Sequence, residues 1–237
     1  MATIVFLHVG NDTAQPTILA QSIRAQNPDA RIIQCTDPET PAVHGADEVK
    51  RLDGNTEHLM VYRLQCFSKL GLTELAIYLD TDMICVAPLD PVTLLDGFDA
   101  AVCERSYEND EMFRTDHPHP DLTRHGWTFS EHAGKTLMQT FPYVACATIT
   151  RDHWFWDECL ATLLQLEEKY HVWYGDKEAI RRVVDDGRHK IGEILEDRFG
   201  HLPWAPDPED GEPVLLHFKG AERKQMMVEL GQENNFL

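Results

Sequence analysis

The chain has 237 residues, of which 43% are hydrophobic and 26% are charged, a composition typical of a folded globular protein rather than a disordered or fibrous one. Its formal net charge of −19 argues against nucleic acid as a partner, because the phosphates would be repelled. No stretch approaches the roughly 20 apolar residues that cross a bilayer, and residues 1–10 lack the features of a signal peptide, so we expect a cytoplasmic protein with no integral membrane segment.

Apolar, β-favouring runs and helical patterns alternate along the first hundred residues. Strands are expected at 3–9, 31–35, 75–79 and 99–103, with helices at about 14–25 and 56–70. This alternation predicts an α/β fold in which helices flank a mixed, mainly parallel central sheet. At this length we expect one domain, residues 1–237.

The second half of the chain is less regular. Residues 104–141 are rich in charge, Gly, Pro and His and predict a long functional loop, in which Trp127 and Phe129 either stack on a ligand or anchor the loop. Residues 116–119 resemble part of a metal site, but no matching ligand spacing follows, so a solvated loop is the better interpretation. The elements expected further on are a strand at 143–150, a helix at 152–170, a helix from Asp176, an irregular connection at 191–213 and a short strand at 213–216.

Six cysteines are dispersed along the chain without a C-x-x-C spacing, mostly inside apolar segments. Buried free thiols are therefore expected rather than disulfides or zinc ligands. They are Cys35, Cys66, Cys85, Cys103, Cys146 and Cys159.

Two carboxylates separated by one residue follow the apolar run at 76–79. On an extended backbone, residues i and i+2 project to the same face, so Asp80 and Asp82 converge. Like charges this close repel unless a cation lies between them, and hard oxygen ligands select Mg²⁺ or Mn²⁺. The alternative is an Asx turn at the end of a strand, where Asp is common for local reasons.

The surrounding sequence resembles that of GT-A glycosyltransferases, especially glycosyltransferase family 8. The resemblance lies in Phe67-Ser68-Lys69-Leu70-Gly71-Leu72, the strand ending in Asp80-Thr81-Asp82, and the following Pro88-Leu89-Asp90. A late His-X-X-Gly-X-X-Lys motif of the family is matched by His217 and Gly220; Arg223 stands at the Lys position, and Lys224 follows it.

This resemblance implies a GT-A (nucleotide-diphospho-sugar transferase) fold, with a donor half at about 1–103 and an acceptor-side half at about 104–237. It implies Asp80, Asp82 and His217 as ligands of Mn²⁺ or Mg²⁺. Gly175-Asp176 resembles a family segment beside the reacting sugar, which makes Asp176 and Lys177 the candidate catalytic residues; an N-cap role explains Asp176 equally well. The residues implied in donor binding are His8, Asp12, Arg63, Lys69, Asp80, Lys219, Gly220, Arg223 and Lys224.

The predicted function is a metal-dependent hexosyltransferase that uses a nucleotide-diphosphate sugar, with a UDP-sugar expected. The acceptor is a saccharide or another hydroxyl compound, and the resemblance implies retention of anomeric configuration. Two alternatives remain open: a sugar-phosphate nucleotidyltransferase, which normally has a glycine-rich basic loop after its first strand, and a non-catalytic nucleotide-sugar-binding protein.

Overall fold

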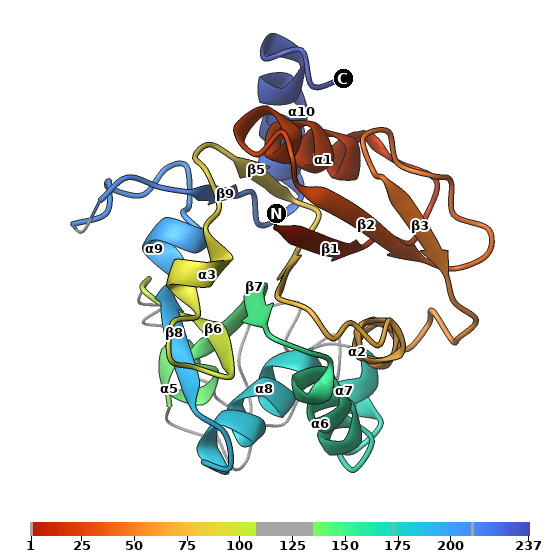
Figure 1. The fold of residues 1–237 in the computed structure, drawn as a ribbon, viewed down its shortest axis with the longest axis vertical. Helices are drawn as coiled ribbons and strands as arrows, with labels where there is room; N and C mark the ends of the chain where they lie inside the picture. Colours follow the sequence, from red (N-terminus) through yellow and green to blue (C-terminus); the bar gives the residue numbers. More distant parts are fainter. Residues whose placement is uncertain (1, 108–134, 173, 210) are drawn as a thin grey trace.

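We describe the protein from a computed structural model, in which residues 2–107, 135–172, 174–209 and 211–237 are described. Trp127, Phe129, the 116–119 segment and all the histidines of the predicted 104–141 loop lie outside the described residues. The described residues form a layered α/β structure with a central sheet between two groups of helices (Figure 1).

The central sheet has seven strands in the order β3-β2-β1-β4-β7-β6-β8. Among these, β7 runs antiparallel to both of its neighbours, whereas every other adjacent pair is parallel. The strands are β1 (Thr3–Leu7), β2 (Arg31–Thr36), β3 (Glu48–Arg51), β4 (Ala76–Leu79), β6 (Ala100–Glu104), β7 (Tyr143–Thr150) and β8 (Ile191–Leu195).

Alternate side chains of the central strands enter two separate apolar layers, as the period of a β-strand requires. Val5 and Tyr78 belong to a core shared with α2 (Leu59–Lys69), α6 (Trp154–Leu163) and α8 (Gly175–Asp185). On the other face of the sheet, Ile4, Phe6 and Leu79 pack against α1 (Ala14–Gln26). Both faces of these strands are therefore buried, and their sequences are almost continuously apolar.

The helices divide between these two layers. In Figure 1, α1 and α10 lie above the sheet, and α2, α6, α7 and α8 lie below it. The helices whose bounds have not yet been given are α3 (Pro91–Leu94), α5 (Leu137–Thr140), α7 (Lys169–Val172), α9 (Glu196–Phe199) and α10 (Ala221–Glu233). None of the helices within the described residues combines the length and apolar character needed to cross a membrane.

A second, two-stranded sheet joins segments that are far apart in the sequence. β5 (Met83–Cys85) pairs antiparallel with β9 (Leu215–His217), with Met83 opposite His217. The backbone N–H of Phe218 donates to the carbonyl of Asp82 at 2.9 Å, which continues this pairing by one residue. The late histidine is therefore held beside the residue that precedes β5.

The structure corrects the prediction of an irregular connection at 191–213. This range contains β8, which pairs parallel to β6 at the edge of the sheet, and then α9. In β8, Gly192 and Ile194 are buried while Glu193 and Leu195 are exposed, the alternation of an edge strand. The Pro-rich, acidic composition that suggested irregular structure begins only after α9.

Several predicted helix boundaries also change. The helix expected at 152–170 ends at Leu163 and is followed by the separate helix α7, while the helix expected from residue 56 begins at Leu59. The prediction of free thiols is confirmed, because all six cysteines are buried and none forms a disulfide.

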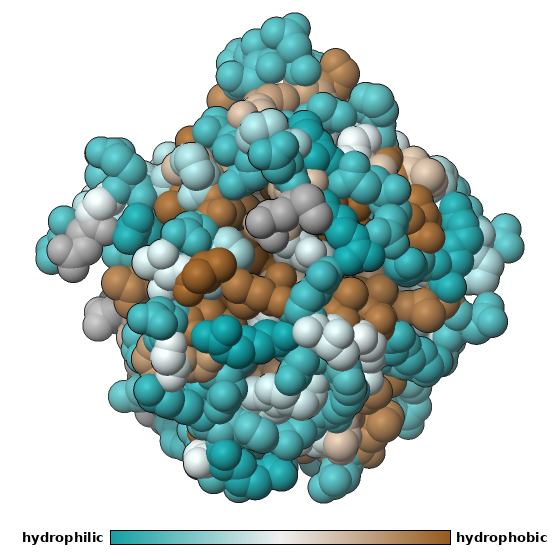
Figure 2. Space-filling model, in the orientation of Figure 1, coloured by the Kyte–Doolittle hydropathy of each residue, from teal (hydrophilic) through white to brown (hydrophobic). Residues whose placement is uncertain are grey.

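The surface agrees with the high charge. On the face drawn in Figure 2, hydrophilic residues predominate, and hydrophobic residues gather in a band across the middle. Comparison with Figure 1 places this band between the upper and lower groups of helices.

Candidate active site

The two neighbouring carboxylates lie on the turn between β4 and β5. The register of β1 with β4 pairs Phe6 with Leu79, so residues just beyond both strands lie at the same edge of the sheet. The N–H of Asp80 donates to the carbonyl of Cys146 in β7 at 2.9 Å, which fixes the start of the turn. The carbonyl of Asp82 accepts a hydrogen bond from the N–H of Phe218, so backbone hydrogen bonds hold both ends of the turn.

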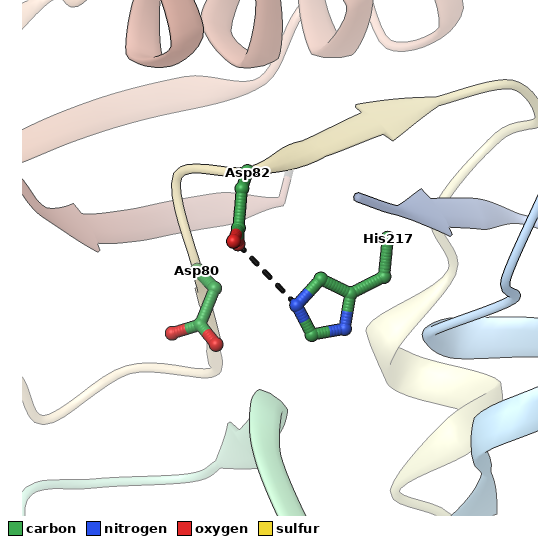
Figure 3. Close-up of side chains that lie close together, drawn as sticks. All are labelled: Asp80, Asp82 and His217. Atoms are coloured by element: carbon green, nitrogen blue, oxygen red, sulfur yellow. Dashed lines mark ion pairs between the residues drawn. The ribbon is translucent and has the colours of Figure 1, made fainter. Parts of the chain in front are cut away.

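His217 meets the carboxylate pair from β9. Its side chain is 5% exposed, and its Nε2 lies 3.3 Å from Oδ1 of Asp82 (Figure 3). One ligand atom each from Asp80, Asp82 and His217 lie within 4.8 Å of one another. Two carboxylate oxygens and an imidazole nitrogen are a donor set that suits Mg²⁺ or Mn²⁺, so these three residues could hold a metal ion.

The electrostatics of this group favour positive charge. Burial lowers the pKa of His217, but the adjacent Asp82 and Cys146 outweigh burial and raise it. Burial raises the pKa of Asp82, but the His217 imidazole and the Lys224 ammonium together outweigh burial and hold this pKa well below its ordinary value. A cation placed here would therefore meet an ionised carboxylate, and it would take the place of the imidazole proton.

Arg63 links Asp80 to a second part of the site. From α2, its guanidinium lies 2.8 Å from Oδ1 of Asp80 and 3.2 Å from Oδ2 of Asp176, and it donates to the carbonyl of Ala145 at 2.5 Å. Its side chain is 11% exposed, and that of Asp176 is 5% exposed. Burial lowers the pKa of Arg63, but the two carboxylates outweigh burial and raise it. Arg63 therefore stays charged and orients both acids.

The N-terminus of α8 places Asp176 and Lys177 beside this arginine. Asp176 is not the N-cap that the alternative expects, because Tyr174 occupies that position and Asp176 lies in the first turn of α8. Its Oδ1 accepts a hydrogen bond from the backbone N–H of Lys177 at 2.8 Å. The Lys177 ammonium lies 4.6 Å from the centre of the Tyr174 ring, and burial lowers its pKa. Asp176 therefore combines a structural contact with a position in the site.

The acidic and basic groups described above line a pocket of about 410 Å³, within the size range of small-molecule sites. His217, which contacts Asp82, is not itself part of this lining. The pocket lies where the end of β1, the start of α2, the β4–β5 turn and the start of α8 meet. Its lining consists of Leu7, His8, Val9, Gln15, Leu59, Met60, Arg63, Leu79, Asp80, Thr81, Asp82, Tyr174, Asp176, Lys177 and Lys224.

His8 occupies the end of β1 within this lining. It is 9% exposed, and its buried Nε2 has no hydrogen-bond partner among the described residues. Burial lowers the pKa of its imidazole, which keeps the ring neutral. The pocket wall therefore contains a neutral polar atom without a described protein partner.

Two predicted donor-binding residues lie away from the pocket lining. Asp12 is exposed, and its Oδ1 accepts a hydrogen bond from the N–H of Ala14 at the start of α1. Lys69 is the last residue of α2, whereas the pocket is lined by the first turns of that helix. Their part in donor binding stays a prediction.

The basic residues around Gly220 point in different directions. Gly220, with a φ of +90°, precedes α10. Lys219 forms an ion pair with the buried carboxylate of Glu196, and Arg223 lies over the Trp204 ring at 3.7 Å; neither lines the pocket. Lys224 does line it, and its Nζ is 3.2 Å from Oδ2 of Asp82.

Sequence reasoning missed Tyr174, which lines the pocket directly before Gly175-Asp176. Its φ of +58° is unusual for a residue other than glycine, and its ring stacks on Phe141 with an interplanar angle of 7°. The backbone after Tyr174 passes so close to Tyr170 that position 175 requires glycine, because a Cβ there would lie 1.9 Å from the carbonyl oxygen of Tyr170. The sequence feature that could have identified Tyr174 as a pocket residue is its place directly before the Gly175-Asp176 pair.

Comparison with known proteins identifies the fold. No protein-family model and no curated protein matches this chain. Among solved structures, the chain is similar to the glycosyltransferase GlyE of Streptococcus pneumoniae TIGR4, with a TM-score of 0.57 and 14% sequence identity. The match covers 99% of this chain and 64% of GlyE, so the chain spans less than two thirds of that protein.

The predicted fold class is therefore confirmed. The mixed, mainly parallel sheet flanked by helices matches the structure of a glycosyltransferase. The closer resemblance to family 8 stays a prediction.

Proposed function

We propose that this protein is a metal-dependent glycosyltransferase that moves a hexose from a nucleotide-diphosphate sugar to a hydroxyl acceptor. The observation that carries the proposal is the convergence of His217 with Asp80 and Asp82, the two carboxylates that line the pocket. The similarity in fold to a glycosyltransferase supports it. From the sequence resemblance we further propose a UDP-sugar as donor and retention of anomeric configuration.

Breaking a sugar–diphosphate bond leaves negative charge on the departing phosphate oxygen. A Mn²⁺ or Mg²⁺ ion held by Asp80, Asp82 and His217 would supply Lewis-acid stabilisation of that charge. Lys224 lines the same pocket and contributes a positive charge of its own. Lys177, next to Asp176, also lines the pocket and supplies a second ammonium group.

Asp176 is the acidic group placed to position a sugar. Its carboxylate is fixed by Arg63 and by the N–H of Lys177, so it is pre-oriented before a ligand enters. His8, which lines the pocket at the end of β1, is the residue that we assign to the nucleotide. The pocket therefore offers separate contacts for nucleotide, diphosphate and sugar.

A thermal-shift screen of nucleotide sugars, each with and without Mn²⁺, tests the ligand class. We expect a nucleotide-diphosphate sugar to raise the unfolding temperature more with Mn²⁺ than without it, because binding to the folded state stabilises it. Free nucleosides, which lack the diphosphate, serve as the control. Equal stabilisation with and without the ion would contradict metal dependence.

Asp82→Asn tests the metal site directly. This substitution removes one ligand charge, so we expect metal-dependent sugar transfer to fall by at least about a hundredfold while the circular dichroism spectrum is unchanged. Asp207→Asn makes the same change at an exposed position outside the pocket and should transfer at the parent rate. Transfer by the Asp82 variant at the parent rate would overturn the assignment.

A further inference from the structure

Both carboxylate oxygens of Asp82 already face nitrogen atoms. Oδ1 lies 3.3 Å from His217 Nε2, and Oδ2 lies 3.2 Å from Lys224 Nζ. The Asp82 side chain is 14% exposed, whereas that of Lys224 is 40% exposed. A lysine ammonium thus neutralises a candidate metal ligand from the solvent side.

Lys224 is set apart from the basic residues next to it. Arg223 donates to the carbonyl of Lys219 at 3.1 Å and stacks on Trp204, and Lys219 pairs with Glu196. Of these three basic residues, all within the described part of the chain, Lys224 lines the pocket. The first turn of α10 therefore directs one ammonium at Asp82 and holds the neighbouring guanidinium elsewhere.

We propose that the Lys224 ammonium is a tethered cation that competes with the divalent ion for Asp82. The inference rests on the proposed function and concerns how the divalent ion and the diphosphate bind to its site. A divalent ion needs the lone pairs of Asp82, and a second cation at the same carboxylate is repelled, so ion binding displaces Lys224. The displaced ammonium remains in the pocket on a flexible side chain, where an anionic diphosphate offers it a new partner.

This exchange couples the two ligands. The ion frees Lys224 for the anion, and the anion stabilises the state in which Lys224 has left Asp82. By linkage, each ligand then raises the affinity for the other. Asp80 does not take part in the exchange, because its arginine partner is far less exposed and is held by Asp176 and a backbone carbonyl as well.

Mn²⁺ binding without nucleotide tests the competition. We would titrate the full chain with Mn²⁺ by calorimetry as the parent, as Lys224→Met and as Arg223→Met. Both variants lose one positive charge at adjacent positions, but only Lys224→Met removes a contact to Asp82. We expect Lys224→Met to bind Mn²⁺ about fivefold more tightly than Arg223→Met, the size of effect that a partly exposed ion pair allows.

The affinity for UDP at saturating Mn²⁺ should change in the opposite direction to the affinity for Mn²⁺. Lys224→Met should bind UDP about fivefold more weakly than Arg223→Met, because the ammonium that pairs with the diphosphate is gone. Lys224→Arg retains the charge and should bind UDP more tightly than Lys224→Met. A purely structural role for Lys224 would not tighten one ligand and weaken the other.

The outcomes separate this inference from the proposed function. If parent and Asp82→Asn bind Mn²⁺ equally, the metal site itself is wrong and both proposals fall. If Asp82→Asn abolishes Mn²⁺ binding but the Lys224 and Arg223 variants have equal Mn²⁺ affinities, only the competition is overturned. Tighter Mn²⁺ binding and weaker UDP binding by Lys224→Met, relative to Arg223→Met, support it.

Discussion

Arg63 joins two carboxylates that the proposed reaction would use separately. It holds Asp80, a candidate metal ligand, and Asp176, a candidate sugar contact, from a nearly buried position in α2. Removing a single partner from a buried ion pair leaves an uncompensated charge, which costs more than the pair contributes. The stability of the site therefore depends on this arginine as much as on the acids.

Arg63→Met should consequently lower the free energy of unfolding by about 3 kcal/mol, measured by urea denaturation. The double variant Arg63→Met, Asp176→Asn removes one of the two stranded charges and should recover part of this loss. A single variant as stable as the parent would show that Asp176 does not depend on Arg63.

Sequence spacing alone does not decide which basic residue after Gly220 faces the pocket. His217 and Gly220 match a known spacing, and this led to Arg223 and Lys224 as alternatives. Consecutive helical residues point about 100° apart, so only one of them can face the pocket. Which one does so depends on how α10 leaves β9, and the structure selects Lys224.

At the scale of elements, α8 contains a buried acid that makes stability depend on pH. Glu178 is 2% exposed and accepts hydrogen bonds from Arg181 at 2.8 Å and from Arg182 at 2.7 Å. Burial raises the pKa of Glu178, but these arginines outweigh burial and hold the pKa below its ordinary value of 4.5. The folded state therefore favours the charged carboxylate, and this stabilisation is present above about pH 4.5 and is lost as the pH falls through the lowered pKa.

Glu178→Gln should be less stable than the parent at pH 7 by about 2 kcal/mol, and the difference should shrink as the pH falls below about 4.5. Urea unfolding across this range measures it. Glu209→Gln, at an exposed position, should match the parent at every pH. A constant gap for the Glu178 variant would show that its effect does not arise from ionisation.

The elements that sequence patterns found differ physically from those they missed. β1, β2 and β4 are buried on both faces, so their apolar runs predict strands directly. β3 lies at the sheet edge with a polar sequence, and β5 has three residues, too few for a period to be visible. The pairing of β5 with β9 is a long-range contact without a local pattern, so the meeting of His217 with Asp82 was expected only from the family resemblance.

At the scale of the whole molecule, charge imbalance opposes compaction. The chain has 40 acidic and 21 basic residues, and folding brings these charges closer together. Salt screens such repulsion, because the Debye length falls as ionic strength rises.

Raising NaCl from about 20 to about 300 mM at pH 8 should therefore increase the thermal midpoint by about 3 °C. Calorimetry at two pH values checks this. At about pH 5.5, nearer the pI of about 4.9, the increase should be smaller because less net charge remains to be screened. An equal increase at both pH values would point to salt effects other than charge screening.

The β5–β9 pairing also orders events during synthesis. The ribosome makes the turn that contains Asp80 and Asp82 long before it makes His217, and at about 5–20 residues per second the interval is of the order of ten seconds. Throughout that interval the nascent chain has the acidic turn but not the strand that pairs beside it. The three-residue group can therefore form only after His217 has been made, well after synthesis of the acidic turn. Its formation requires residues that are far apart in the sequence to have reached their native neighbours.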